Sequence, residues 1–407
     1  MYKNVKYLIK TVAISIIASI TVLNATTLDP KNPCYQSIKK IDDRYQSDKV
    51  FKLLMDQSFT HMVQAPKGYM RDGNPWIGKS YKDLLPFLEE WCEFLPQARG
   101  SSDNGLKYIQ EMDMFSYQNP FAKALFQSKV GLELFNNYMK EYGKFMDTPA
   151  STRYVSEWLY DARTEKEDYI LPDPKASDGG FTSFNTFFAR ALKDQNQSRP
   201  QTMPYRDYVI TAPTDCIINS IPQEITDEET LIATKGEQKL NLKQMFDNSK
   251  HYKRFVGGVA LSCVLMPNTY HHYHSPIDGE IVESKIIKGA LLGMNDFPSF
   301  VPKNGNVGYH GSNFNQFSDY QRGYFIADTG KYGYVGMVAV GLSNIGSIVF
   351  EKKYHNISEA VLVKRGNALG HFLYGGSLFM MFFEKGKLKS NAIRVRLGNQ
   401  IGIFDTP

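Results

Sequence analysis

The chain has 407 residues, which is more than one small module needs and suggests about two domains. Hydrophobic residues make up 42% of the chain and charged residues 22%, so a packed core is possible and a mainly disordered chain is excluded. The net charge at pH 7 is +5, and three of the lysines lie in the first 25 residues, so the rest of the chain is close to neutral. That balance argues against a protein dedicated to binding nucleic acid. The aromatic content of 13% suits a β-rich core or an aromatic-lined pocket.

Residues 1–28 have the pattern of a signal peptide or a membrane anchor. A basic segment ends at Lys10, and residues 11–28 carry no charge and include an apolar run. Leu23-Asn24-Ala25 is an imperfect cleavage site because a bulky residue stands where a small one is preferred, and the uncharged stretch is near the lower length limit of a spanning helix. We therefore expect export, with the protein periplasmic or membrane-associated. A buried N-terminal helix fits the leading lysines less well.

Residues 30–165 are expected to form a helical region, because apolar residues recur there at helical spacing. These residues are Ile38, Ile41, Tyr45, Phe51 and Leu54; Leu84, Leu88, Trp91 and Leu95; and Ala124, Leu132, Leu134, Tyr138 and Met139. Thr148-Pro149 has the residues of an N-cap and a first turn, and predicts a helix that carries Val155 and Trp158. The apolar faces indicate core packing rather than a cofactor site.

A polar stretch, Arg163–Gly180, marks the expected domain boundary, and residues 175–407 are expected to be β-rich. The candidate strands are Tyr208–Ile218, Phe255–Leu265, Gly279–Ile287, Gly336–Val340, Gly346–Phe350, Ala360–Val363, Leu378–Phe383 and Ala392–Leu397. The expected fold class is therefore α+β, with an N-terminal helical region followed by a β-rich domain of mainly antiparallel sheet.

The four cysteines contain no Cys-x-x-Cys pair, which argues against a zinc ribbon or a thioredoxin-type site. In an oxidising compartment, Cys34 could pair with Cys92 and Cys216 with Cys263. Four free buried thiols are an equally good interpretation of the sequence.

Three short segments of the β-rich region carry residues that could act chemically. Asp215 ends the run Ala212–Asp215, three histidines lie in Tyr270–Gly279, and Tyr374-Gly375-Gly376-Ser377 precedes an apolar run. Each has an ordinary explanation, namely a turn acid, surface histidines and a turn before a strand. A metal site at the histidines is disfavoured because no acid or cysteine lies at ligand spacing. Together, however, Asp, His and Ser are the parts of an activated hydroxyl nucleophile, and a serine that follows two glycines has an unshielded carbonyl before it.

Over about residues 181–383 the sequence resembles the phosphatidylserine decarboxylase family of pyruvoyl-dependent enzymes. Six segments match the family's motifs in order, and six in register are highly specific. They are Phe184–Lys193 with Arg199-Pro200, Ala212–Asp215, Lys235-Gly236, Leu265–Gly279, Val338–Gly341 with Ile345–Ile348, and Gly366–Ser377. Residues 30–165 also resemble the decarboxylase-associated helical domain that precedes the catalytic domain in one subgroup of the family.

The resemblance implies a proenzyme that cleaves itself between Gly376 and Ser377. Ser377 would attack the Gly376 carbonyl, and elimination would then break the chain. Residue 377 would become a covalent pyruvoyl group at the start of an α chain, 377–407, and residues 1–376 would form the β chain. The pyruvoyl carbonyl would act as the electron sink for decarboxylation.

The resemblance also assigns roles to individual side chains. Asp215, His274 and Ser377 take the family's triad positions, with His274 as the base and Asp215 orienting it. His271 takes the position of a second active-site histidine, and either histidine could return a proton to the substrate. No metal is expected.

The implied reaction converts phosphatidylserine to phosphatidylethanolamine with release of carbon dioxide at a membrane surface, and the α and β chains could assemble further into a homo-oligomer. The sequence departs from the family at several positions near the site. These are Cys216 for Gly, Thr269 for Asp, His272 for Arg, Leu378 for Thr, and Tyr320–Arg322 for Asn-Glu-Arg. Because the subgroup with the associated helical domain also contains decarboxylases of free aromatic amino acids, the resemblance leaves open a free aromatic amino acid as the substrate.

A second alternative is a non-catalytic, exported β-rich binding protein. His274–Gly279, followed by Gly289 and Leu292-Gly293, has the look of a lipoyl-type module, and a fold does not determine a function.

Overall fold

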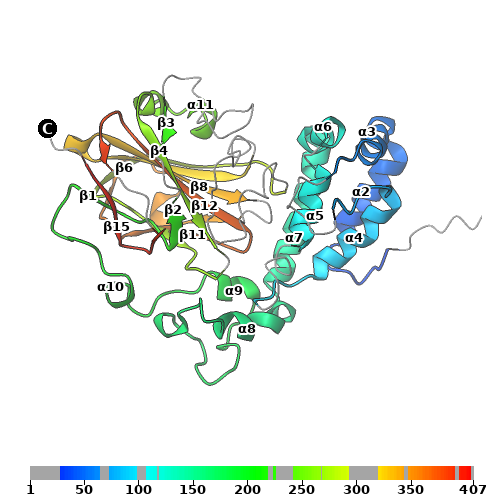
Figure 1. Ribbon diagram of the computed structural model, residues 1–407, viewed down its shortest axis with the longest axis horizontal. Helices are drawn as coiled ribbons and strands as arrows, with labels where there is room; N and C mark the ends of the chain where they lie inside the picture. Colours follow the sequence, from blue (N-terminus) through cyan, green and yellow to red (C-terminus); the bar gives the residue numbers. More distant parts are fainter. Residues whose placement is uncertain are drawn as a thin grey trace, which may run out of the picture.

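The computed structural model describes residues 28–64, 73–98, 107–116, 119–218, 223–225, 242–266, 268–292, 320–342, 347–389 and 394–404. Residues 1–27 of the expected signal or anchor, Lys235-Gly236 and Ile345-Gly346 lie outside this part of the chain. Within it, a helical region is followed by antiparallel sheets, which confirms the α+β class (Figure 1).

The helices of the N-terminal region bury most of the apolar faces expected from the sequence. They are α2 (Tyr35–Ser47), α3 (Lys49–Thr60), α4 (Tyr81–Glu93), α5 (Lys107–Ser116), α6 (Pro120–Gln127) and α7 (Lys129–Met146). Ile38, Leu88 and Trp91 are fully buried, whereas Ala124, expected on the apolar face, is exposed. The Cys34–Cys92 disulfide joins the residue before α2 to α4, so the first expected pairing is present.

Two tyrosine hydroxyls of helix α7 donate hydrogen bonds to backbone carbonyls of α4 and of the residue just after it. Tyr138 donates to the Leu88 carbonyl at 2.7 Å, and Tyr142 donates to the Phe94 carbonyl at 2.9 Å. The rings of both tyrosines are buried, and each hydroxyl has a hydrogen-bond partner, so the helix can bury aromatic surface without leaving these polar groups unpaired. The helix ends at Met146, with Asp147 as its C-cap.

Short helices lead from α7 to the sheets. They are η1 (Pro149–Tyr154), α8 (Val155–Leu159), η2 (Lys166–Asp168), α9 (Phe184–Phe188) and α10 (Gln195–Ser198). The helix expected after Thr148-Pro149 opens as a 3-10 turn before it becomes α8, which buries Val155 and Trp158. Helix α9 begins with a capping box in which Ser183 and Thr186 bond each other's backbone N–H.

Three antiparallel sheets make up the C-terminal region. The largest has nine described strands in the order β10-β6-β7-β8-β12-β4-β2-β14, with β3 also paired to β4; the others are β1-β15-β13 and β5-β11-β9. The strands are β1 (Val209–Thr211), β2 (Cys216–Ile218), β3 (Gln223–Glu224), β4 (Val259–Leu265), β5 (His272–His274), β6 (Gly279–Ile287), β7 (Arg322–Asp328), β8 (Tyr334–Leu342), β9 (Ile348–Phe350), β10 (Val361–Val363), β11 (Ala368–Phe372), β12 (Gly376–Phe383), β13 (Leu388–Lys389), β14 (Arg394–Val395) and β15 (Gln400–Phe404).

The expected strands differ from the observed ones where proline or glycine interrupts the backbone pairing. The strand expected over Tyr208–Ile218 is two strands in different sheets, β1 and β2, with Pro213 between them. The strand expected from Phe255 begins only at Val259, because Phe255 ends a 3-10 helix, η3 (Tyr252–Phe255), and Gly257 has a φ of +78°. Strand β12 begins earlier than expected, at Gly376, so Ser377 lies inside a strand rather than in a turn.

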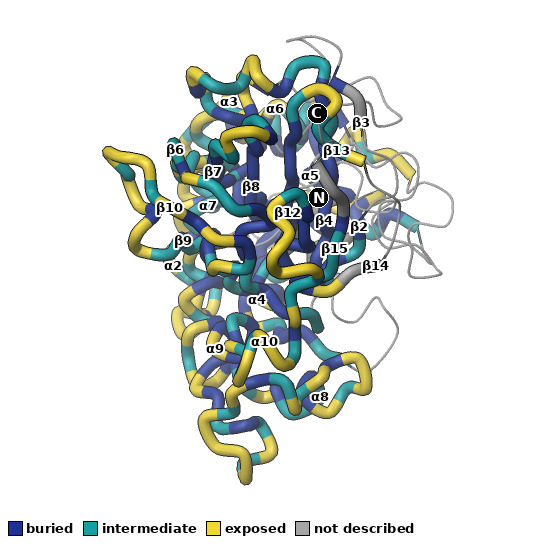
Figure 2. The backbone as a smooth tube through the Cα atoms, turned by 90° about the vertical axis from the view of Figure 1, so that its left-hand side faces the viewer, coloured by how far each residue is buried: buried dark blue, intermediate teal, exposed yellow. Residues whose placement is uncertain are grey.

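A single cluster of buried hydrophobic side chains runs through both the helices and the sheets. Figure 2 shows the strands β8, β12 and β4 at its centre, with exposed residues at the loops around them. The domain limits 30–165 and 175–407 therefore remain an interpretation of the sequence. None of the described helices has the length and apolar content needed to cross a membrane.

Candidate active site

Ser377 lies at the start of β12, a central strand of the largest sheet. It is the second residue of β12, opposite Leu265 of β4 on one side and Gly341 of β8 on the other. The side chain is buried, and its hydroxyl donates to the Gly375 carbonyl at 3.3 Å. Gly375 has a φ of +140°, which residues with a side chain rarely adopt. Gly375 thus lets the chain turn into β12, and the serine hydroxyl points back to the carbonyl of that glycine.

Asp215 is held by a buried cation. Its carboxylate accepts hydrogen bonds from Arg199 Nε at 2.9 and 3.0 Å and from Arg199 Nη2 at 2.7 Å, and from the Leu397 backbone N–H at 2.7 Å. Burial alone would lower the pKa of Arg199, but the hydrogen bonds and charge of Asp215 outweigh it and raise that pKa above its ordinary value. Arg199 also pairs with Asp168 at 2.6 Å and with Glu165 at 3.1 Å. The ion pair fixes the orientation of the Asp215 carboxylate.

His274 has a partner at each ring nitrogen. Nδ1 lies 2.8 Å from the Gly366 carbonyl oxygen and Nε2 lies 3.0 Å from the Tyr270 hydroxyl. Burial, together with the nearby His272, lowers the pKa of His274 to about 4, so the ring is neutral at physiological pH. Since a carbonyl can only accept, Nδ1 carries the proton and Nε2 accepts from Tyr270.

His271 and His272 have the same type of partner. His271 Nδ1 lies 2.9 Å from the Thr269 carbonyl oxygen, and His272 Nε2 lies 2.9 Å from the Ala189 carbonyl oxygen. Burial and the Arg190 cation lower the pKa of His271 well below its ordinary value, and burial lowers that of His272. Both rings are therefore neutral, and each keeps one nitrogen as a proton acceptor.

The three segments expected to carry chemistry meet at one end of the sheet. Val264 of β4 pairs with Ile217 of β2 on one side and with Leu378 of β12 on the other. Strands β2 and β12 therefore run parallel to each other with β4 between them, and Asp215, just before β2, lies near the level of Ser377 at the start of β12. The His274 backbone N–H donates to the Pro213 carbonyl at 2.7 Å, which places it beside the Asp215 segment. In the described part of the chain, no hydrogen bond joins His274 to Asp215 or to Ser377.

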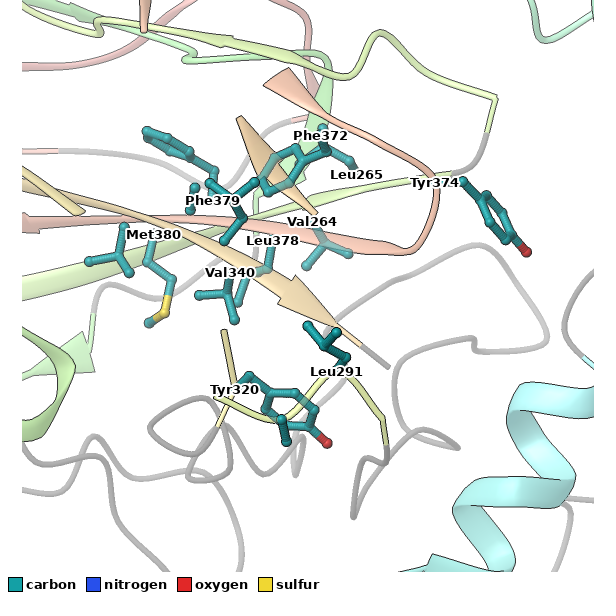
Figure 3. Close-up of a cluster of buried hydrophobic side chains, with 14 of the residues drawn as sticks. Val264, Leu265, Leu291, Tyr320, Val340, Phe372, Tyr374, Leu378, Phe379 and Met380 are labelled. Atoms are coloured by element: carbon teal, nitrogen blue, oxygen red, sulfur yellow. The ribbon is translucent and has the colours of Figure 1, made fainter. Parts of the chain in front are cut away.

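Helix α9 anchors the loop that leads to Ser377. The Tyr374 backbone N–H donates to Asn185 Oδ1 at 2.9 Å. The Tyr374 ring packs edge-on against Phe184 and Phe188, and Phe188 stacks on His271 with 3.7 Å between ring centroids. Figure 3 shows Tyr374 at the edge of the buried apolar cluster, with its ring directed away from Val264, Leu265 and Phe379. These contacts bring His271 close to the loop before the serine.

The second expected disulfide, Cys216–Cys263, also lies at the site. Cys216 follows Asp215 directly, and Cys263 of β4 faces Phe379 of β12. The bond therefore links the strand after Asp215 to the neighbour of the strand that carries Ser377.

Several side chains of the site could not be assigned from the sequence. Tyr270 and Asn185 lie in matched motifs but show no pattern that indicates their partners, His274 and Tyr374. His371 of β11 lies opposite His272, and burial and His272 lower its pKa to about 4. These residues lie in segments that match the family's motifs, but only the fold shows which groups each of them contacts.

The site combines a buried serine that follows two glycines with buried, neutral histidines, and comparison with known proteins gives the class of the protein. The family model described as phosphatidylserine decarboxylase matches residues 184–403, which include Asp215, His271, His274 and Ser377. The chain belongs to the phosphatidylserine decarboxylase family.

Individual relatives agree with the family match. A phosphatidylserine decarboxylase proenzyme of Fusobacterium nucleatum is 30% identical over 276 residues, which cover 67% of this chain and 81% of the relative. A protein of the same name from Clostridium perfringens is 28% identical over 70% of this chain and 85% of its own length. Phosphatidylserine decarboxylase proenzyme 2 of Oryza sativa is 28% identical over 66% of this chain, which corresponds to 41% of the rice protein.

Proposed function

We propose that this protein is a proenzyme that cleaves itself between Gly376 and Ser377 and then decarboxylates phosphatidylserine to phosphatidylethanolamine, as a carboxy-lyase. The observation that carries the proposal is the placement of Ser377, which is buried at the start of β12 with its hydroxyl turned back toward the glycine peptides. Membership of the family, and relatives named as proenzymes, support the same reaction.

Cleavage begins with the serine hydroxyl. His274 Nε2 takes the hydroxyl proton as Ser377 Oγ attacks the Gly376 carbonyl carbon; the C–O bond forms, the C–N bond breaks, and the freed amine takes up a proton. The resulting ester is then eliminated: the Cα proton of residue 377 leaves, and Gly376 departs as a carboxylate. Water hydrolyses the unsaturated residue 377 to a pyruvoyl group and releases ammonia.

The neutral state of His274 suits this role, because a protonated ring could not accept the serine proton. Nε2 of His274 accepts a hydrogen bond from the Tyr270 hydroxyl, so this bond must break before Nε2 can accept the proton of the serine hydroxyl. Asp215 acts at a distance. Asp215, paired with Arg199, fixes the segment that contains Pro213, and the Pro213 carbonyl accepts a hydrogen bond from the His274 backbone N–H.

The residues around Ser377 fit a pyruvoyl group formed in place. The serine lies where a new chain terminus would remain bound between β4 and β8, and the glycines before it offer no side chain that would obstruct the carbonyl. When present, the group supplies an electron sink for the carbanion left by carbon dioxide. His271, stacked on Phe188, orients the substrate; its free ring nitrogen takes a proton from the substrate's ammonium group and returns it to the α-carbon.

We propose export as the setting of this reaction, at a membrane surface that supplies the phospholipid. Both disulfides support an oxidising compartment, because such bonds are rare in reducing ones. The α and β chains would both come from this one precursor.

Mass spectrometry of the purified protein, with activity on two substrates, tests the proposal. We expect a fragment 377–407 with an N-terminal pyruvoyl group, and carbon dioxide release from phosphatidylserine vesicles. Ser377→Ala should remain one chain and be inactive. An intact wild-type chain would favour a non-catalytic binding protein, and carbon dioxide release from free tryptophan but not from the vesicles would favour the amino-acid decarboxylase.

A further inference from the structure

The end of helix α7 is connected to the loop before Ser377 by a chain of two hydrogen bonds. Asn185 lies between them, and its side chain is 3% exposed. Its Nδ2 donates to Asp147 Oδ1 at 2.9 Å, and its Oδ1 accepts from the Tyr374 backbone N–H at 2.9 Å. Because one amide group serves both partners, a shift of Asp147 is transmitted to Tyr374.

The helix that carries Asn185 is itself fixed to the helical region. The Phe184 backbone N–H donates to Ser151 Oγ at 2.8 Å, and the same hydroxyl donates to the carbonyls of Met146 and Thr148 at 3.0 and 2.7 Å. Figure 1 shows α9 beside the lower end of α7, between the helices and the sheets. The position of α9 is thus set by the end of α7, not by the sheet alone.

Only Gly375 and Gly376 separate Tyr374 from Ser377. Neither glycine has a side chain that could fix its own position by packing. Gly376 is itself paired with Leu342 of β8, so its carbonyl is positioned by strand pairing from Gly376 onward and, on the preceding side, by the Tyr374–Asn185 bond across Gly375. Attack by Ser377 Oγ depends on that carbonyl lying within near-contact distance, and a misplacement of about 1 Å can slow a reaction about a hundredfold.

We infer that Asn185 is a positioning residue for self-cleavage and that Asp147 orients it, so that the helical region takes part directly in maturation of the proenzyme. This inference rests on the self-cleavage proposed above. It assigns the helical region a role at the scissile bond rather than one in folding alone.

The test follows cleavage of the full-length chain after cell-free synthesis under oxidising conditions, by gel, with the folded fraction measured by protease resistance in the same samples. Asn185→Asp removes the Nδ2 donor and sets two carboxylates against each other. We expect cleavage to slow about ten- to a hundredfold per folded molecule. Asp147→Asn keeps an acceptor oxygen for Asn185, and its rate should stay within about threefold of wild type.

The double variant Asn185→Asp with Asp147→Asn exchanges donor and acceptor and should restore most of the rate. Should Asn185→Asp fail to fold, Asp147→Ala serves instead. This residue is exposed, so the fold should persist while cleavage slows severalfold. The matched control is Asn119→Asp, a buried asparagine of the helical region whose Nδ2 donates to the Ser58 carbonyl at 3.1 Å. The Asn119→Asp variant loses an equivalent hydrogen bond at a position far from Tyr374 in the sequence, so it should cleave at the wild-type rate.

Equal cleavage rates per folded molecule for wild type, Asn185→Asp and Asp147→Ala would overturn the inference and leave the proposed function intact. Equal slowing by Asn119→Asp would also overturn it, because loss of any buried amide would then have the same effect. A wild-type chain that never cleaves would instead refute the proposed function, and the inference with it.

Discussion

The two disulfides allow the stability of the fold to be separated from the chemistry of the site. Cys216–Cys263 closes a loop with a sequence separation of 47, and Cys34–Cys92 one of 58. The entropy of loop closure then predicts nearly the same stabilisation for each, about 4 kcal/mol. Double substitution to alanine should lower the apparent Tm by about 8–16 °C in either case.

The effect on cleavage should differ between the pairs. Cys216 follows Asp215, and Cys263 belongs to β4, which pairs with Ser377 through Leu265. Loss of this disulfide loosens the backbone on which the serine and Asp215 are aligned, and cleavage per folded molecule should fall at least about tenfold. Loss of Cys34–Cys92 should leave the cleavage rate of the folded fraction unchanged.

Differential scanning fluorimetry gives the two Tm values, and gel analysis at 15–20 °C below the lower Tm gives the cleavage rates. Equal slowing by the two double variants would refute the proposed alignment. A Tm change confined to one variant would refute the assignment of equal stability to the two bonds.

Further predictions concern the site residues and the N-terminus. His274→Ala and Asp215→Ala should slow cleavage on the order of 10²–10⁴-fold, because the serine hydroxyl needs a base; normal cleavage in His274→Ala would make a neighbouring histidine the candidate base. His271→Ala should leave cleavage intact and lower carbon dioxide release, measured on the same preparation. The folded-state pKa of His274, about 4, lies below the ordinary value of 6.5, so its contribution to stability is complete above pH 6.5 and is lost as pH falls toward 4. Urea unfolding at several pH values should show a loss that is about 3 kcal/mol larger in the wild type than in His274→Gln, because the other buried histidines titrate in both proteins. Ser377→Cys should still cleave, more slowly, as seen by gel, since a thiol can replace the hydroxyl as nucleophile. Residues 1–30 fused to a reporter that is active only outside the cytoplasm should give a signal, and cytoplasmic retention would contradict the expected export.

Elements with a local signal could be predicted from the sequence, and elements defined by long-range pairing could not. Strand β6 was expected over the same residues that it occupies, because Gly279 opens it and β-branched residues are frequent in it. Strand β7 gave no such signal. Residues 322–327 are all buried, so the side chains do not alternate between polar and apolar. Strand β11 contains Gly370 and His371, and its place between β5 and β9 depends on segments far apart in the chain.

The candidate site divides in the same way. The resemblance to the family, carried by motifs matched in order, implied roles for Asp215, His274 and Ser377. The partner of each side chain depends on where distant segments meet. The resemblance implied that Asp215 orients His274, whereas the fold pairs Asp215 with Arg199 and His274 with Tyr270. Asn185 and Tyr374 lie far apart in the sequence, and no local pattern joins them.

The pairing of the C-terminal strands has a consequence for the lifetime of the enzyme. A cut after Gly376 would leave 377–407 bound through β12 between β4 and β8, through β14 beside β2 and through β15 beside β1. A prosthetic group made from residue 377 could then neither dissociate nor be replaced from solution, and no vitamin would be needed to supply it. A side reaction that destroyed the group would inactivate that molecule permanently, because its only source, the serine, has already been consumed. The cell would restore activity only by synthesising a new chain.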